Sequence, residues 1–178
     1  SFEQNGGTHS VAGDLNLVAT VLLDTGEVAA ASATFEESVR MVESAVATRD
    51  VKEAARRGFL YQQARVALAR DDTKAATAAT ASYCLQAEDK QIPFELRRCH
   101  ELRGMVALAS GDHASAIAQL GQASSQDPRV LFELAMAYRA AGKTDAARDT
   151  LSRVVNFNAL SLPLALVRPR AIALLKDM

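Results

Sequence analysis

The chain has 178 residues, of which 49% are apolar and 23% charged, enough for one globular domain with a hydrophobic core. Its 20 Lys and Arg residues nearly balance 21 Asp and Glu residues, so charge gives no reason to expect nucleic acid or an anionic membrane as a partner. No apolar run reaches the roughly 18 residues of a membrane span, and the opening SFEQNGGTHS lacks the basic and apolar parts of a signal peptide.

Helical periodicity interrupted by breakers runs through the chain, and no strand-like alternation extends over four or more residues. In chain order, the sequence predicts helices over 11–24, 27–47, 51–70, 72–88, 94–110, 112–124, 129–141 and 144–156, and a last one toward residue 175. Consecutive helices form hairpins at about 11–47, 51–88, 94–124 and 129–156, with a terminal helix at about 163–177. We expect a flexible segment over residues 1–10 and a single all-α domain over residues 11–178.

Two of the predicted helix starts carry a side-chain signal. Asp50 followed by Glu53 resembles a capping box, in which the Asp oxygen accepts from a free amide and the Glu reaches back. Asp127-Pro128 ends one hairpin and opens the next, because Pro cannot continue a helix but fits its first turn.

Two glycines mark predicted turns inside hairpins. Gly111 and Gly142 stand where a helix ends in a left-handed residue, a conformation that costs Gly nothing. Asp112 is then placed to cap the following helix.

One pattern occurs twice: an amphipathic helix, a Gly-centred turn and a second helix with small residues facing the first. The copies are HELRGMVALASGDHASAIAQL at 100–120 and LFELAMAYRAAGKTDAARDTL at 131–151. A single hairpin cannot bury its apolar stripe alone, so this repetition predicts hairpins that stack on one another.

The spacing of small and bulky residues in these copies resembles the tetratricopeptide repeat (TPR) family. With Gly111 in the turn, the family's positions are filled by Gly104, Ala116, Leu120, Ala123 and Pro128. With Gly142 in the turn, they are filled by Leu131, Leu134, Ala135, Tyr138, Ala147 and Leu151. Weaker copies place Asp71 and Gly26 in the turn, and the stretch 93–160 is also similar to bacterial helical-repeat proteins.

The resemblance implies a right-handed superhelix of stacked antiparallel helical hairpins, a TPR-like α-solenoid with a C-terminal capping helix. The capping helix is expected to cover the last hairpin with Leu164, Val167, Ile172 and Leu175. Pro169 is expected to start or kink that helix.

In this family the first helix of each hairpin lines a concave groove that receives a peptide or a partner helix. By register, the resemblance assigns to this groove Asn16, Thr20, Tyr61, Arg65, Arg98, Glu101, Met105, Phe132, Met136 and Arg139. Aromatic, thioether and guanidinium groups can anchor a partner, adapt to its shape or bind a carboxylate. The alternative for Met105, Phe132 and Met136 is that they pack in the core between hairpins. The Lys and Asn clamp of chaperone-binding members is not reproduced, which disfavours a chaperone C-terminus as the ligand.

Strings that imitate catalytic motifs are incomplete in this chain. Gly142-Lys143-Thr144 lacks the upstream Gly and the strand of a phosphate-binding loop, and His100-Glu101 lacks the second His of a zinc protease. Because the histidines and cysteines are scattered, we expect no catalytic residue, no metal and no cofactor. Cys84 and Cys99 lie near the facing ends of successive predicted hairpins and could touch, but the favoured interpretation is that both are buried free thiols.

The favoured function is therefore a non-enzymatic scaffold that binds a peptide or partner protein, and it predicts solvent-accessible Tyr61, Arg65 and Arg139. The alternative is a structural domain of a larger protein that self-associates through its end helices, for instance as a homodimer. A third hypothesis, an enzyme or ligand sensor, needs a closed pocket between hairpins. We expect a soluble protein, of the cytoplasm or of the periplasm. Any targeting segment is absent from this chain, so the sequence does not decide between the two compartments.

Overall fold

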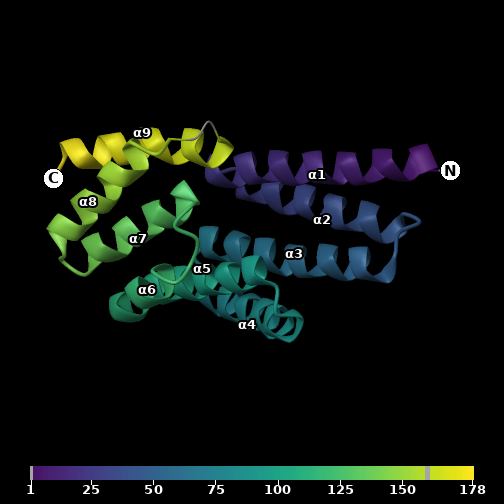
Figure 1. Cartoon of the computed structure of the whole chain (residues 1–178), viewed down its shortest axis with the longest axis horizontal. Coiled ribbons are helices and arrows are strands. Elements are labelled where there is room, and N and C mark those ends of the chain that lie inside the picture. Colours follow the sequence, from purple (N-terminus) through teal and green to yellow (C-terminus); the bar gives the residue numbers. More distant parts are fainter. Residues whose placement is uncertain (1, 159–160) are drawn as a thin grey trace. The chain divides into compact units, whose positions relative to one another are not determined.

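The computed structural model describes residues 2–158 and 161–178, with side chains from residue 11 onward. These residues form nine helices and no strand, which confirms the all-α fold (Figure 1). The helices are α1 (Phe2–Asp24), α2 (Val28–Ser44), α3 (Arg49–Ala69), α4 (Thr73–Lys90), α5 (Pro93–Ala109), α6 (His113–Leu120), α7 (Pro128–Ala140), α8 (Thr144–Val155) and α9 (Leu162–Lys176). No described helix combines the length and the apolar character that a membrane crossing needs.

Two helix boundaries differ from the expected ones by several residues. α1 begins at Phe2 rather than at residue 11, so it includes nine of the ten residues of the expected flexible segment. α6 ends at Leu120, four residues before the expected end. Ser1 lies outside the described residues.

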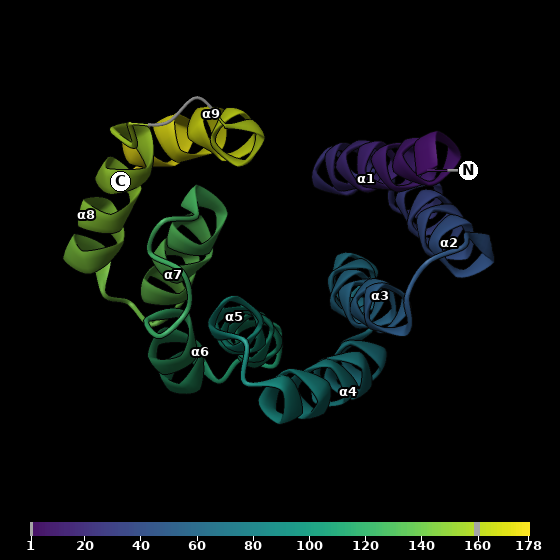
Figure 2. The same cartoon turned by 45° about the vertical axis from the view of Figure 1, so that its right-hand side comes forward.

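The chain divides into two compact units, residues 1–90 and residues 91–178. In the first unit α1 packs on α2 and α3 packs on α4, while α2 also packs on α3 (Figure 2). In the second unit α5 pairs with α6 and α7 with α8, and α9 packs on α8 and α7. The expected assignment of all these helices to a single domain stays a prediction.

The turn inside each hairpin has the same geometry in all four cases. A residue with positive φ follows the first helix. Its amide and the amide of the next residue both donate to carbonyls near the helix end, as in a Schellman motif. In the second hairpin, for example, the Asp71 amide donates to Leu68 at 3.0 Å and the Asp72 amide donates to Ala67 at 2.9 Å. The left-handed residues are Gly26, Asp71, Gly111 and Gly142, with φ of 92°, 57°, 79° and 71°.

Side-chain caps explain where several helices begin. The Asp112 carboxylate accepts from the Ser115 amide at 3.0 Å, which confirms the expected cap. Asp127 accepts from the Arg129 amide at 2.9 Å and caps α7, which has Pro128 in its first turn as expected. The expected capping box at Asp50 is wrong.

Thr48 caps α3 instead, since its hydroxyl accepts from the Val51 amide. The Glu53 carboxylate is turned outward, where it pairs with Arg49 at 2.7 Å and with Lys90 at 3.4 Å. A cap two residues earlier leaves Asp50 inside the first turn, where its charge favours the helix N-terminus.

One core cluster of the first unit combines small and aliphatic residues with the aromatic side chain of Phe35. Ala19 and Leu23 of α1 meet Ala31 and Phe35 of α2, and Val66 of α3 completes the cluster. Ala19 and Ala31 are fully buried, which allows the two helices of the hairpin to approach closely.

In the second unit, α5 and α6 approach through a glycine. A Cβ placed on Gly104 would lie 2.5 Å from Leu120 Cγ and 3.1 Å from the Leu120 backbone nitrogen. Ala116 and Leu120 then pack with Val130 and Leu134 of α7. The small residue of the repeat pattern is therefore required by helix packing.

The last helix covers the final hairpin, and Leu175 packs against its core as expected. Leu164 and Val167 are buried as expected, whereas Ala171 is buried in place of Ile172, which is exposed. Pro163 stands at the start of α9, and Pro169 lies inside the helix, so Pro169 does not begin it. Arg168 Nε donates to the Val155 carbonyl at 2.8 Å and ties α9 to the end of α8.

Both cysteines are buried, but the expectation that they are free thiols is wrong. Cys84 and Cys99 are each disulfide-bonded.

Candidate functional site

The groove residues assigned to α1 are engaged within their own hairpin. Asn16 Nδ2 donates to Ser38 Oγ of α2 at 2.6 Å, and Ser38 Oγ donates to the Ala12 carbonyl at 2.8 Å. Thr20 Oγ1 donates to the Asn16 carbonyl at 2.8 Å. Asn16 therefore ties α1 to α2, and Thr20 bonds to its own helix.

The groove residues assigned to α3 are buried, so the expectation that Tyr61 and Arg65 are solvent-accessible is wrong. Tyr61 is 1% exposed and its ring lies 5.8 Å from that of Tyr83, centroid to centroid. Arg65 is 7% exposed and donates to Asp24 of α1 at 3.0 Å. A buried guanidinium needs such a partner, because a desolvated charge without one is costly.

In the second unit, the assigned groove residues fall into two groups. Phe132 is buried in the core between α7, α8 and α9, with the Arg170 guanidinium 4.5 Å from its ring centroid. Met105 and Met136 are half-buried against the cores, which favours the packing alternative for all three. Arg139 is exposed as expected.

Arg98 and Glu101 line a recess of about 280 Å³ at the start of α5. Its other walls come from the segment between α6 and α7, Ser124 to Pro128, and from Ser161 and Pro163 at the start of α9. Glu101 is buried, whereas Arg98 is half-buried and lies over the Phe94 ring at 4.3 Å from its centroid.

Phe94 and Arg97 complete this recess, and the family register does not assign either of them to the groove. Phe94 is 52% exposed, and Arg97 is exposed with no hydrogen bond or ion pair within 2–158 and 161–178. The sequence signal for them is the run from Phe94 to Arg98, which places an aromatic ring and two guanidinium groups within about one helical turn.

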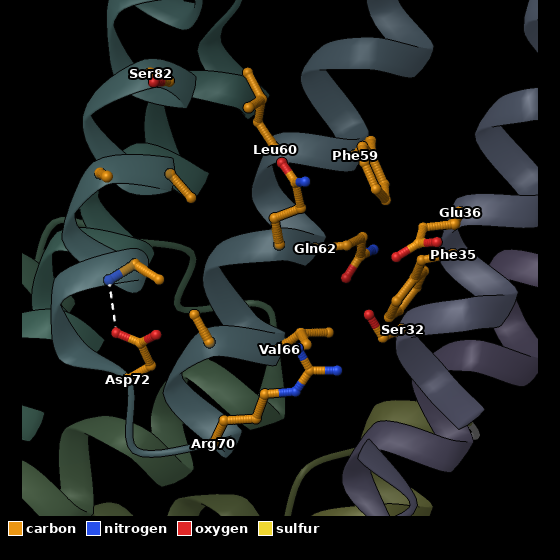
Figure 3. A pocket seen from close by; sticks show the side chains of 15 residues that line it. Ser32, Phe35, Glu36, Phe59, Leu60, Gln62, Val66, Arg70, Asp72 and Ser82 are labelled. Atoms are coloured by element: carbon orange, nitrogen blue, oxygen red, sulfur yellow. Dashed lines mark hydrogen bonds between the residues drawn. The ribbon is translucent and has the colours of Figure 1, made fainter. Parts of the chain in front are cut away.

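A larger groove of about 480 Å³ lies in the first unit, where α2 and α4 stand on either side of α3 (Figure 3). Phe35 and Glu36 of α2 form one wall, and Phe59, Leu60 and Val66 of α3 form the floor. The other wall consists of small side chains of α4, namely Ala75, Ala78, Ala79 and Ser82.

Charged groups lie at one end of this groove. The Asp72 carboxylate caps α4 by accepting from the Ala75 amide at 2.9 Å, and Arg70 extends from the end of α3 into the groove (Figure 3). None of the sequence-assigned groove residues lines it.

The two units differ in charge. Residues 1–90 contain nine Lys and Arg against 13 Asp and Glu, a net charge of −4. Residues 91–178 contain 11 against eight, a net charge of +3. The recess at α5 therefore lies in a cationic unit and the groove at α3 in an anionic one.

Neighbouring groups lower the pKa of three carboxylates at the surface. Glu43 of α2 accepts two hydrogen bonds from Arg56 of α3, at 2.7 and 2.6 Å, and this pairing lowers the pKa of Glu43. Hydrogen bonds from Arg49 and Lys90 lower the pKa of Glu53. Bonds from Ser115 lower the pKa of the Asp112 cap.

The residues that imitate catalytic motifs have structural roles in the hairpins. Gly142 and Lys143 form the turn between α7 and α8. His100 Nδ1 lies 2.9 Å from Gln119 Oε1 of α6, so it joins the two helices of a hairpin. Among the described residues, no three His, Cys, Asp or Glu side chains gather as metal ligands.

Four hairpins with one turn geometry, stacked helix on helix within each unit, define a helical-repeat protein. A family model described as tetratricopeptide repeat matches residues 107–166, from the end of α5 into α9. This match supports the resemblance of the chain to TPR-like repeat proteins. Comparison with curated proteins gives no match, and comparison with solved structures gives none either. Repeats of this kind are generally non-enzymatic scaffolds for protein–protein interaction.

Proposed function

We propose that this protein is a non-enzymatic scaffold that binds a peptide segment of a partner protein in the recess of α5, α7 and α9. The observation that carries the proposal is the exposed Phe94 ring, with Arg98 on one face and the exposed guanidinium of Arg97 in the same recess. Exposed aromatic and Arg side chains in one depression are typical of residues that dominate binding energy.

The chemistry of the recess favours an acidic segment. Arg97 can bind a carboxylate through two parallel hydrogen bonds, and Phe94 offers an apolar surface to a neighbouring side chain of the ligand. The net charge of +3 in this unit attracts the same kind of partner over a longer range.

The partner can be identified with a photo-crosslinking amino acid in place of Phe94. Once the cross-linked protein has been purified, Arg97→Glu should weaken its binding at least about tenfold, because a like charge then faces the ligand. Arg153→Glu is the matched control, since Arg153 is an exposed cation of α8 outside the recess. Equal affinity of the partner for Arg97→Glu and for the unchanged chain would refute this site.

Self-association is the second candidate, and one observation favours it. Val11, Leu17 and Val18 of α1 are each about half exposed, a concentration of apolar surface unusual for one helix. If α1 pairs with α1 of a second copy, the solution mass should rise with protein concentration, and Val18→Glu should return it to that of a monomer.

A further inference from the structure

We propose that the groove of α2, α3 and α4 is a second docking site, which takes an amphipathic helix of about three turns from a partner protein with an acidic residue facing Arg70. This site lies in the first unit and shares no residue with the recess at α5. It is therefore independent of the function proposed above.

The dimensions of the groove suit a helix. Its floor runs along α3 from Phe59 to Arg70, which corresponds to about 16 Å at a rise of about 1.5 Å per residue. The wall of α4 has Ala75, Ala78, Ala79 and Ser82 at helical spacing on one side. Helix axes can approach to about 8–10 Å only where side chains are this short.

The floor supplies the apolar surface that such a helix would bury. Phe59 and Leu60 are half-buried, whereas Phe35 in the α2 wall and Val66 in the floor are buried in the core cluster of the unit. An occupant with Leu or Met side chains at i, i+3 and i+4 would remove Phe59 and Leu60 from water.

A helix fits better than an extended peptide because of the backbone. The walls and floor are all helical, so their amides and carbonyls are already paired within α2, α3 and α4. An extended segment would find no free edge to bond with, whereas a helix satisfies its own backbone groups.

Charge complementarity identifies the polar end of the occupant. The Arg70 guanidinium makes no hydrogen bond or ion pair within 2–158 and 161–178, although its unit is anionic overall. Asp72, at the same end, is occupied as the cap of α4. An acidic residue of the ligand would give Arg70 the partner that the chain itself does not supply.

The test is a selection from a displayed library of 14-residue peptides with apolar residues at helical spacing, using the full chain as bait. Selected peptides should become helical on binding, as seen by circular dichroism. They should bind Ala78→Arg at least about tenfold more weakly, because the long side chain fills the groove.

Ala81→Arg is the matched control, since Ala81 is an exposed alanine of the same helix outside the groove. It should leave affinity unchanged, as should Arg97→Glu at the other recess. Thermal unfolding of each variant shows that it is folded.

Charge reversal tests the polar end. Arg70→Glu should weaken the selected peptides about tenfold, and replacement of the peptide's acidic residue by Lys should restore their binding. The proposal is overturned if no peptide is selected, if the selected peptides bind Ala78→Arg as well as the unchanged chain, or if they bind without becoming helical. It is also overturned if Ala78→Arg dissolves a dimer of the chain, because the occupant is then a second copy.

Discussion

The first helices of the hairpins are held in different ways in residues 1–90 and in residues 91–178. In the first unit, polar side chains link neighbouring helices, as Asn16 does with Ser38 and Arg65 with Asp24. In the second unit, α5 and α6 meet through the missing side chain of Gly104, and one turn away His100 and Gln119 link the same two helices.

The family model matches residues 107–166, which lie in the second unit. In the first unit the hairpins keep the same turn geometry, while polar pairs join neighbouring helices. One turn geometry therefore accommodates more than one way of joining neighbouring helices.

Loss of the buried pair should have the largest effect on stability. Arg65→Met leaves the Asp24 carboxylate without its cation, while Oδ2 of that carboxylate already lacks a hydrogen-bond partner. We expect the free energy of unfolding in urea to fall by about 2–4 kcal/mol. Arg40→Met, an exposed cation of α2, should change it little. Addition of Asp24→Asn to Arg65→Met should recover part of the loss; if it does not, the charge of Asp24 is not the cause.

The second largest loss of stability should follow from adding a methyl group where α5 and α6 approach closely. Gly104→Ala would place Cβ within 2.5 Å of Leu120 Cγ, and we expect a loss of about 1–3 kcal/mol, although Ala is the better helix former. The same substitution in a Leu120→Ala background should cost clearly less, since the clash is then removed. An equal cost in both backgrounds would show that the two helices do not meet through this pair.

The matched glycine of the first unit should respond in the opposite direction. Gly58 lies inside α3, and a Cβ at this position meets nothing within 4 Å. Gly58→Ala should therefore raise the free energy of unfolding by about 0.5–1 kcal/mol through helix propensity alone. A loss of stability would contradict the difference drawn between the two units.

The smallest expected effect is on the stability of the fold at acidic pH. The pKa of Glu43 is held below its ordinary value of 4.5 by Arg56, so the pair stabilises the folded state above that pH and is lost as the pH falls through the lowered pKa. In Glu43→Gln, the drop in melting temperature between pH 5 and pH 3 should be slightly smaller than in the unchanged chain. The pair is exposed, so 0.5 M salt should reduce the difference. A larger drop in melting temperature in the variant would contradict a stabilising role of the Glu43–Arg56 pair.

Local chemistry made much of the fold predictable. The left-handed turns at Gly111 and Gly142, the cap at Asp112 and the helix start at Asp127-Pro128 depend on neighbours within a few residues, and the structure confirms them. Thr48 was missed because Asp50 offers an equally good capping pattern two residues later. Only packing decides between such overlapping signals.

The site was less predictable because it depends on residues far apart in the chain. The partner of Arg65 lies 41 residues away, so nothing near Arg65 in the sequence indicates that it is buried. The groove of α2, α3 and α4 likewise exists because both outer helices pack on α3. The role of the assigned groove residues in binding stays a prediction.

The uniform turns also bear on how the length of this protein can change during evolution. A Schellman turn with one left-handed residue fixes the number of residues between the two helices of a hairpin, so an insertion there would break both of its hydrogen bonds. The connections between hairpins, such as residues 45–48 and 121–127, obey no common geometry. Small insertions and deletions among relatives should therefore concentrate in these connections. Larger changes in length should add or remove whole hairpins.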